Sequence, residues 1–278
     1  MADSSIVGTL LFLLTGLFTY KAFMDKTYLE ENIFDVDKIL VDQEYRRILT
    51  SGFLHANWIH FGFNMGTLLA FSFFMESTLG PINFLLIYFV SLLGGSLLSL
   101  YIHRNHADYQ AYGASGAVCG ILLASVVLFP EARFPIPFSD ASIPRWILSV
   151  AFVILSIFGI KKSWGNIGHD AHLGGGLCGV LLTIALQPSI LQTNWWIILL
   201  ILVPTISFLI LIVKKPETMM IKNYWGVDFK QKRKEHAVKK TQINSLKLDY
   251  LLDKIKREGL DSLSKTERAA LDKLKDEL

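Results

Sequence analysis

The chain has 278 residues, of which 52% are hydrophobic and 18% are charged, and its formal net charge is +3. Soluble domains have about 45–50% apolar and about 25% charged residues, so this composition disfavours a soluble enzyme, a disordered chain and a nucleic-acid-binding protein. Residues 1–213 hold ten Lys and Arg residues, and residues 214–278 hold the other seventeen. This division predicts an apolar body and a basic tail that form separate domains.

Seven apolar segments lie within the first 213 residues. A helix that crosses a bilayer needs roughly 20 apolar residues, because about 30 Å of hydrocarbon is crossed at about 1.5 Å per residue. Lipid cannot bond the backbone, so we expect an all-α, polytopic transmembrane helical bundle. The polar stretch 24–52 predicts a loop with a short interfacial helix near Val36–Leu40. The seven segments are approximately 5–23, 53–75, 82–102, 114–129, 144–160, 168–187 and 195–213.

The basic tail has the pattern of two helices. Gly259 predicts the end of the first, and Ser264 with Glu267 forms a capping-box pattern before the second. The apolar residues of the first helix fall on one stripe, namely Leu248, Leu251, Leu252 and Ile255. We therefore expect three parts, which are a catalytic membrane domain at 1–190, an additional transmembrane helix at 191–214 and a basic helical tail at 215–278.

Three polar clusters interrupt the apolar segments, and polar side chains within membrane helices are costly enough to suggest a function. His60 and Asn64 share one face of the second segment, Ser115 lies among small residues at the start of the fourth, and His169 and His172 open the sixth. These three segments cross the membrane in the same direction, so their polar starts lie near one membrane face. The fourth segment is short, about 24 Å of helix, which predicts that Ser115 is submerged in a water-filled cavity.

These residue types suit hydrolysis of a peptide bond inside the membrane. A serine hydroxyl becomes a good nucleophile when a base takes its proton, and histidine has a suitable pKa. The Ser115 backbone N–H, the Asn64 amide and the His60 imidazole are candidate donors to the oxyanion. Asp170 points away from the histidines at about 100° per residue, which favours a Ser–His dyad over a triad. The glycines after His172 would let the sixth segment pack closely against the fourth.

The ordered motifs are His55-x4-His60-x3-Asn64, Glu76-x3-Gly80, Gly113-x-Ser115-Gly116 and Ala171-His172-x2-Gly175-x3-Gly179. In these residues, and over approximately 5–190, the chain resembles the rhomboid intramembrane serine proteases. The resemblance implies a six-helix core followed here by a seventh helix. It also implies that Ser115 is the nucleophile, that His172 is the general base, and that His60 and Asn64 line the oxyanion hole. Substrates would be transmembrane proteins that enter laterally from the lipid bilayer.

Two positions depart from the family pattern. Family members often carry Trp-Arg in the first loop, whereas here Arg46 and Arg47 follow Tyr45, so the Trp is missing. Many members have an aromatic residue one turn after the serine, on which the histidine stacks. Here that position is Cys119, so we expect other packing to orient His172. The seventh segment and the basic tail are similar to those of members with a six-plus-one layout.

The sequence offers less support for other functions. A metalloprotease would draw its ligands from His60, His169, Asp170 and His172, but the sequence has no HExxH pattern and lacks the general-base Glu. An aspartyl protease is disfavoured because no two segments carry facing Asp residues. A catalytically inactive rhomboid-like protein that binds membrane-protein clients stays open as the alternative, although all four site residues are present.

The remaining histidines are assigned structural roles. His169 shares a face with His172 but lies almost a turn further out, so it is the weaker candidate for the base. We expect His55 to make a hydrogen bond on the loop side. We expect His103 and His106 to be solvated loop residues.

Two signals disagree on orientation. The resemblance implies a cytosolic N-terminus, with the active site and the tail at the opposite face. The positive-inside rule indicates the reverse, and we follow the resemblance. The ending Lys275–Leu278 has the sequence of an ER-retrieval signal. The tail is rich in these residue types, so we interpret this match as a coincidence. We therefore predict that the protein lies in a bacterial inner membrane, with the ER membrane as the alternative. The sequence assigns no cofactor, metal or oligomeric state.

Overall fold

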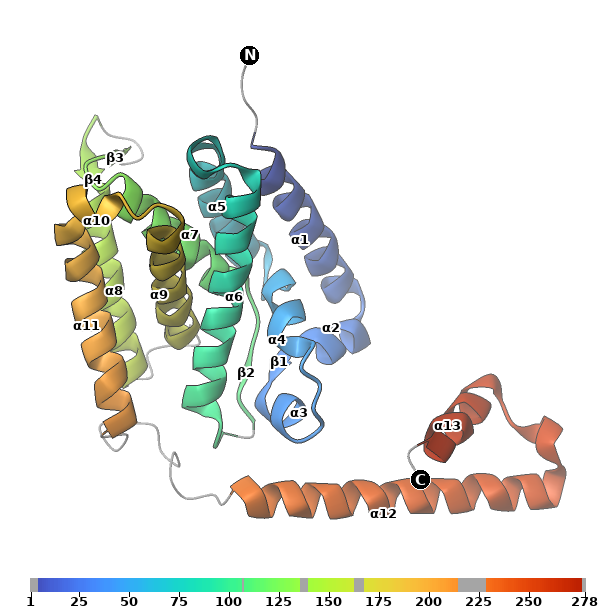
Figure 1. Cartoon of the computed structure of the whole chain (residues 1–278). Helices are drawn as coiled ribbons and strands as arrows, with labels where there is room; N and C mark the ends of the chain where they lie inside the picture. Colours follow the sequence, from blue (N-terminus) through green and yellow to red (C-terminus); the bar gives the residue numbers. More distant parts are fainter. Residues whose placement is uncertain (1–4, 107, 136–139, 163–167, 215–228, 277–278) are drawn as a thin grey trace. The chain divides into compact units, whose positions relative to one another are not determined.

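The computed structural model describes residues 5–106, 108–135, 140–162, 168–214 and 229–276, and it is a bundle of helices with two short two-stranded sheets (Figure 1). Its contacts divide the chain into two units, residues 1–225 and 226–278. The first unit carries all the apolar helices. The predicted polytopic, all-α architecture is confirmed, and the chain is a multi-pass integral membrane protein.

All seven predicted apolar segments are helical, and five of the described helices are long and apolar enough to cross a membrane. Those five are α1 (Ile6–Met24), α5 (Trp58–Leu79), α6 (Pro81–His103), α9 (His169–Leu186) and α11 (Trp195–Lys214). The helix α7 (Ser115–Leu128) has 14 residues, or about 21 Å, and is shorter than the hydrocarbon layer. The helix α8 (Arg145–Lys162) has 18 residues and carries charged residues at both ends.

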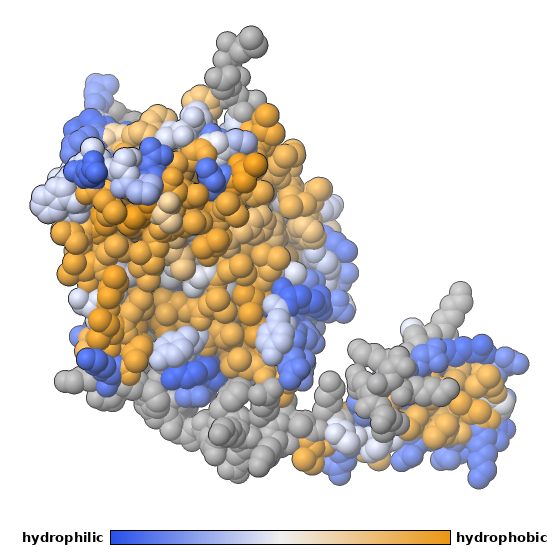
Figure 2. All heavy atoms as spheres, in the orientation of Figure 1, coloured by the Kyte–Doolittle hydropathy of each residue, from blue (hydrophilic) through white to orange (hydrophobic). Residues whose placement is uncertain are grey.

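Helix α7 forms the core of the membrane unit. Twelve of its 14 residues are buried, because α5, α6 and α9 pack around it. A helix covered on every side has to be apolar all round. The outward faces of the other helices are apolar as well, and Figure 2 shows hydrophobic atoms over the middle of this unit with hydrophilic residues at its two ends. Lipid is the solvent that such a surface fits.

Small residues bring α6, α7 and α9 into backbone contact. A Cβ atom at Gly175 would lie 2.1 Å from the carbonyl oxygen of Gly116, and one at Gly179 would lie 2.5 Å from that of Gly120. On the other side, a Cβ atom at Gly95 would lie 2.5 Å from the carbonyl oxygen of Ala171. The predicted close packing of the glycines after His172 is therefore confirmed.

The segment between α1 and α5 is folded rather than extended. Its elements are α2 (Lys26–Asn32), β1 (Phe34–Asp35), α3 (Val36–Leu40), α4 (Arg47–Thr50) and the 3₁₀ helix η1 (Ser51–Phe53). The helix α3 has the bounds that the sequence predicts. Strand β1 pairs antiparallel with β2 (Gln110–Ala111), with Phe34 opposite Ala111. Three apolar side chains on this segment form a small core of their own, namely Phe34, Val36 and Ile39.

Arg47 anchors this segment where the family pattern has Trp-Arg. Its side chain is 4% exposed, and its Nε donates to Glu44 Oε2 at 2.6 Å. Its Nη1 donates to the backbone oxygens of Glu30 and Ile33 at 2.7 and 3.0 Å. One guanidinium thus satisfies two backbone carbonyls of the loop and pairs with a carboxylate.

The Glu76-x3-Gly80 motif fixes two helix ends. The Glu76 carboxylate accepts from the N–H groups of Val7 and Gly8 at 3.1 and 2.8 Å, and from the Ser5 hydroxyl, so it caps the start of α1. Gly80 has a φ of +81°, which ends α5 in a conformation that favours glycine, and Pro81 begins α6.

The remaining elements connect and extend the bundle. The strands β3 (Arg133–Pro135) and β4 (Ser142–Pro144) form an antiparallel hairpin before α8, with Phe134 opposite Ile143. The short helix α10 (Ile190–Thr193) leads into α11.

The second unit is a helical pair, as predicted, formed by α12 (Phe229–Glu258), η3 (Leu260–Ser262) and α13 (Lys265–Asp276). Gly259 has a φ of +86° and ends α12. The capping box is present, because the Ser264 N–H donates to Glu267 and the Glu267 N–H donates to the Ser264 hydroxyl. Leu251 is buried against α13, whereas Leu252 is 50% exposed, so the predicted stripe is wrong at Leu252. Leu252 lies about 100° around α12 from Leu251, on a side of the helix that α13 does not cover.

Candidate active site

Ser115 is the first residue of α7, and the glycine two positions before it explains the local backbone. Gly113 has a φ of +148°, and its N–H donates to the Ser51 carbonyl at 3.0 Å. A Cβ atom at Gly113 would lie 2.9 Å from His60 Cε1 and 3.7 Å from Ser115 Oγ. Only glycine fits this conformation and this space. The His60 ring and the Ser115 hydroxyl therefore flank the same glycine.

The first turn of α5 positions His60 and Asn64. Asn57 caps this helix, since its Oδ1 accepts from the His60 N–H at 2.8 Å. Asn64 is buried one turn later, and its Nδ2 donates to the His60 carbonyl at 3.0 Å. The His60 ring faces the start of α7, where it lies beside Gly113. Asn64 follows His60 by one helical turn, and its place beside Ser115 stays a prediction.

His55 connects α1 to the residue before Ser115. Its Nε2 accepts from the Ala114 N–H at 3.5 Å, and its Nδ1 lies 3.0 Å from Thr19 Oγ1. Burial, with a further contribution from His60, lowers the pKa of His55 to about 3, so the ring is neutral. The two contacts assign its proton to Nδ1. His55 thus makes the loop-side hydrogen bond that the sequence predicts, and its ring packs on that of His60 with centroids 5.0 Å apart.

Three side chains in the first turn of α9 contact two neighbouring helices, α8 and α6. His169 packs into α8, where a Cβ atom at Gly159 would lie 2.3 Å from its ring. The Asp170 carboxylate faces α6, where it accepts from the Ser99 hydroxyl. The His172 ring stacks on Phe152 of α8, with centroids 6.1 Å apart and planes at 30°.

Phe152 is a site residue that the sequence analysis missed. It supplies from α8 the aromatic surface that other family members have on the serine helix, where this chain has the buried Cys119. Phenylalanines are common in apolar segments, so no local pattern distinguished this one. Phe152 thus provides packing against the His172 ring from a helix other than the serine helix, and its part in orienting that ring stays a prediction.

Ser115 and His172 come from helices whose backbones touch beside them. A Cβ atom at Gly116 would lie 3.3 Å from the Ala171 carbonyl oxygen. Both side chains are half-buried. Within the described residues, no hydrogen bond joins the Ser115 hydroxyl to the His172 ring. Hydrogen bonds of catalytic groups often shorten only when substrate binds.

His103 was expected to be a solvated loop residue, and that expectation is wrong. Its side chain is 14% exposed, and its Nε2 lies 3.4 Å from Asp170 Oδ2. The helix α6 extends to His103, which keeps the ring within the bundle. In the described part of the chain, no three His, Cys, Asp or Glu side chains are arranged to hold a metal ion.

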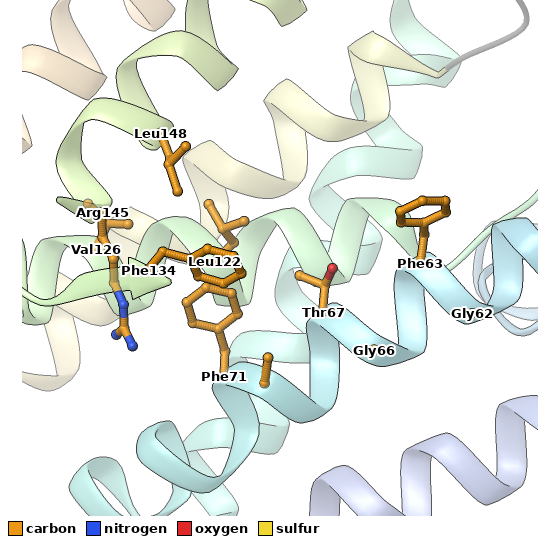
Figure 3. Close-up of a pocket in the computed structure, with 11 residues that line it drawn as sticks. Gly62, Phe63, Gly66, Thr67, Phe71, Leu122, Val126, Phe134, Arg145 and Leu148 are labelled. Carbon is orange, nitrogen blue, oxygen red and sulfur yellow. The ribbon is translucent and has the colours of Figure 1, made fainter. Parts of the chain in front are cut away.

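A cleft of about 320 Å³ lies between α5 and α8, beside α7 (Figure 3). Gly62 and Gly66 of α5 line it, and a Cβ atom at either would meet nothing within 4 Å. In Figure 3, Gly62 and Phe63 lie at one end of the labelled residues and Arg145 lies at the other. The other lining residues are Thr67, Ala70, Phe71, Leu122, Val126, Phe134 and Leu148. The cleft is apolar, and it runs along the helix that carries His60 and Asn64.

The fold and this site define a polytopic helical membrane protein in which serine, histidine and asparagine side chains lie in the first two turns of three helices, α5, α7 and α9. A family model described as the Rhomboid domain matches residues 42–189. This match spans more than half of the chain, and the chain belongs to the rhomboid family. A second model, described as a family of unknown function (DUF6576), matches residues 234–276 in the tail.

The chain is similar to several curated rhomboid proteins. It is 35% identical over 142 residues to Rhomboid protein 1, mitochondrial, of Saccharomyces cerevisiae, which covers 48% of this chain and 40% of that protein. It is 28% identical over 157 residues to the rhomboid protease AarA of Providencia stuartii, covering 51% and 56%. It is also 33% identical over 85 residues to Inactive RHOMBOID-like protein 8 of Arabidopsis thaliana, covering 31% and 24%. The matches thus span about half or less of these relatives.

Proposed function

We propose that this protein is an intramembrane serine endopeptidase that hydrolyses peptide bonds in or near transmembrane segments of membrane proteins. The observation that carries the proposal is the grouping at the start of α7. There, Gly113 separates the His60 ring from the Ser115 hydroxyl, and Gly116 brings α9 with His172 alongside. The similarity to a protein named as a protease supports this function, and the named inactive relative supports the alternative of a client-binding protein without activity.

In the proposed reaction, Ser115 and His172 form the catalytic dyad. A ring nitrogen of His172 takes the hydroxyl proton while Ser115 Oγ attacks the carbonyl carbon of the scissile bond. The C–N bond then breaks, and His172 gives that proton to the leaving amine. Water next attacks the acyl-enzyme and passes a proton to His172, which returns it to Ser115 as the new carboxylic acid leaves. Stacking on Phe152 holds the imidazole plane during these transfers.

Three donors would stabilise the oxyanion. The Ser115 N–H is in the first turn of α7, where backbone N–H groups have no partner within the helix. The Asn64 amide uses one N–H for the His60 carbonyl and has a second that can point to the oxyanion. The His60 ring lies beside Gly113. We expect Asn64→Ala to lower kcat by about 10²–10³, the usual cost of losing one such donor.

The cleft between α5 and α8 is the proposed route for the substrate. It is apolar and lies beside α7, so a transmembrane segment could enter from lipid without exposing its backbone to water. The glycines Gly62 and Gly66 leave room along α5 for a second backbone. A large side chain at Gly66 should raise KM for a transmembrane substrate and leave cleavage of a short soluble peptide unchanged.

Cleavage of a single-span substrate in lipid vesicles tests the proposed function. We expect Ser115→Ala and His172→Ala to abolish cleavage, and His169→Ala to retain much of it. A fluorophosphonate probe should label the wild-type chain and leave Ser115→Ala unlabelled. Activity in His172→Ala together with its loss in His169→Ala would show that the assignment of the base is wrong. A wild-type chain that binds substrate without cleavage or labelling would establish the inactive alternative.

The bacterial inner membrane stays a prediction, because some relatives are named as mitochondrial proteins and one comes from a bacterium. The three-part division at residues 190 and 214 also stays a prediction. We infer from the resemblance that the active site and the tail face away from the cytosol. Labelling of a cysteine introduced in the tail of intact cells tests this orientation, since an impermeant reagent should reach it.

A further inference from the structure

A buried carboxylate lies two residues from the proposed base and takes no part in the reaction described above. Asp170 is 4% exposed in the first turn of α9, inside an apolar bundle. Burying an ionised carboxylate is costly unless other groups pair with it. An asparagine of the same shape could join two helices at lower cost, so the retained charge calls for an explanation.

Two groups on α6 pair with this carboxylate. The Ser99 hydroxyl donates to Asp170 Oδ2, and His103 Nε2 lies 3.4 Å from the same oxygen. Ser99 and His103 are one turn apart on α6, so they meet the acid from the same helix face. The acid therefore joins the first turn of α9 to the last turns of α6.

The same network reaches the loop that leads to Ser115. The His103 ring stacks on Tyr109, with centroids 3.5 Å apart and planes at 6°. Burial and then the Asp170 charge raise the pKa of Tyr109, which agrees with their proximity. The Tyr109 carbonyl accepts from the Val36 N–H at 3.2 Å. The strand β2 and Gly113 follow directly, so the network touches both chain segments that carry the proposed dyad.

The direction of each side chain on α9 explains how Asp170 could act on His172. Successive residues point about 100° apart, so the first turn is held against α8 by His169 and against α6 by Asp170. With these two faces fixed, the rotation of the helix is fixed, and so is the direction of His172.

We propose that Asp170 is a positioning residue, which through Ser99 and His103 sets the rotation of α9 and so the place of the His172 ring relative to Ser115. This inference rests on the proposed function. The carboxylate exchanges no proton with substrate. Its role is to hold His172 in place relative to Ser115, through the contact of its carboxylate with Ser99 and His103 of α6.

The experiment compares Asp170→Asn with the wild-type chain in lipid vesicles. We expect kcat to fall by about 10–100-fold, by analogy with the groups that orient metal-binding histidines, with KM changed less than about two-fold. Labelling of Ser115 by a fluorophosphonate should slow by the same factor. Glu267→Gln removes a paired carboxylate from the tail and is the matched control, with kcat and labelling unchanged.

A double-mutant cycle separates positioning from simple support of the fold. If Asp170 and His103 act as one unit, Asp170→Asn/His103→Gln should lose no more activity than Asp170→Asn alone. The proposal would be overturned if the double variant lost as much activity as the two single variants together. It would also be overturned if labelling of Asp170→Asn fell only in proportion to the fraction of that variant that is unfolded. Should Asp170→Asn fail to fold, Ser99→Ala and His103→Gln are expected to show the same loss of kcat.

The two proposals fail in different ways. Cleavage that persists in Ser115→Ala contradicts the proposed function itself. Loss of cleavage in Ser115→Ala, together with wild-type kcat in Asp170→Asn, contradicts only the positioning role.

Discussion

Alanine at position 175 is expected to push α7 and α9 apart at the proposed site. Its Cβ atom would lie 2.1 Å from the Gly116 carbonyl oxygen, and ordinary contact begins near 3.4 Å, so the two backbones must separate by about 1.3 Å. Neither backbone can rotate away as a flexible side chain could. Such overpacking costs about 1–3 kcal/mol of stability. A misplacement of about 1 Å can cost about 10²-fold in rate, so kcat should fall by about 100-fold or more.

The assay measures cleavage of a single-span substrate in vesicles together with thermal unfolding of the same samples. Gly16→Ala is the matched control, because its Cβ atom on α1 would meet Phe61 at an ordinary 3.4 Å. We expect that control to keep both activity and stability. A Gly175→Ala variant with wild-type kcat and an unchanged unfolding temperature would refute the argument that backbone contact between α7 and α9 sets the site.

Three further changes test other parts of the structure. Gly113→Ala should abolish cleavage, because the new Cβ atom would lie 2.9 Å from the His60 ring and because alanine is strained at this φ. A variant that cleaves at the wild-type rate would contradict this prediction. Arg47→Ala should lower the free energy of unfolding by about 1–3 kcal/mol by leaving buried carbonyls unpaired, as thermal unfolding can measure. In the tail, Lys254 and the helix cap hold the pKa of Glu267 at about 2, below its ordinary 4.5. The protection of the α13 amides, expressed relative to their intrinsic exchange rate at each pH, should therefore be high above about pH 4.5 and fall as the pH falls toward 2, and Glu267→Gln should remove this fall.

The sequence predicts which residues form the candidate site, and that assignment stays a prediction, whereas the surroundings of these residues were only partly predictable. His60 and Asn64 stand one helical turn apart on α5, and the structure packs α7, which carries Ser115, against both α5 and α9. The distance between Ser115 and His172 did not follow from the sequence, because it depends on how far two helices slide and rotate against each other.

Other contacts were missed for the same reason. The stacking of Phe152 on His172 joins α8 to α9, and the contact of His103 with Asp170 joins α6 to α9. A single helix shows which residues share a face, but it does not show which neighbour that face meets. His103 was misassigned because polar residues follow it directly, although α6 continues through it.

By itself, the sequence determined the membrane helices, the small-residue faces and the helical pair of the tail. Those features depend on apolar length, on helical periodicity and on capping residues, and all three are properties of a local stretch of chain. Only the tertiary structure decided that Arg47 anchors the first loop, that Phe152 supports His172 and that Asp170 faces α6. Each of these contacts joins residues distant in the chain, and it forms because glycine-lined helices approach until their backbones touch.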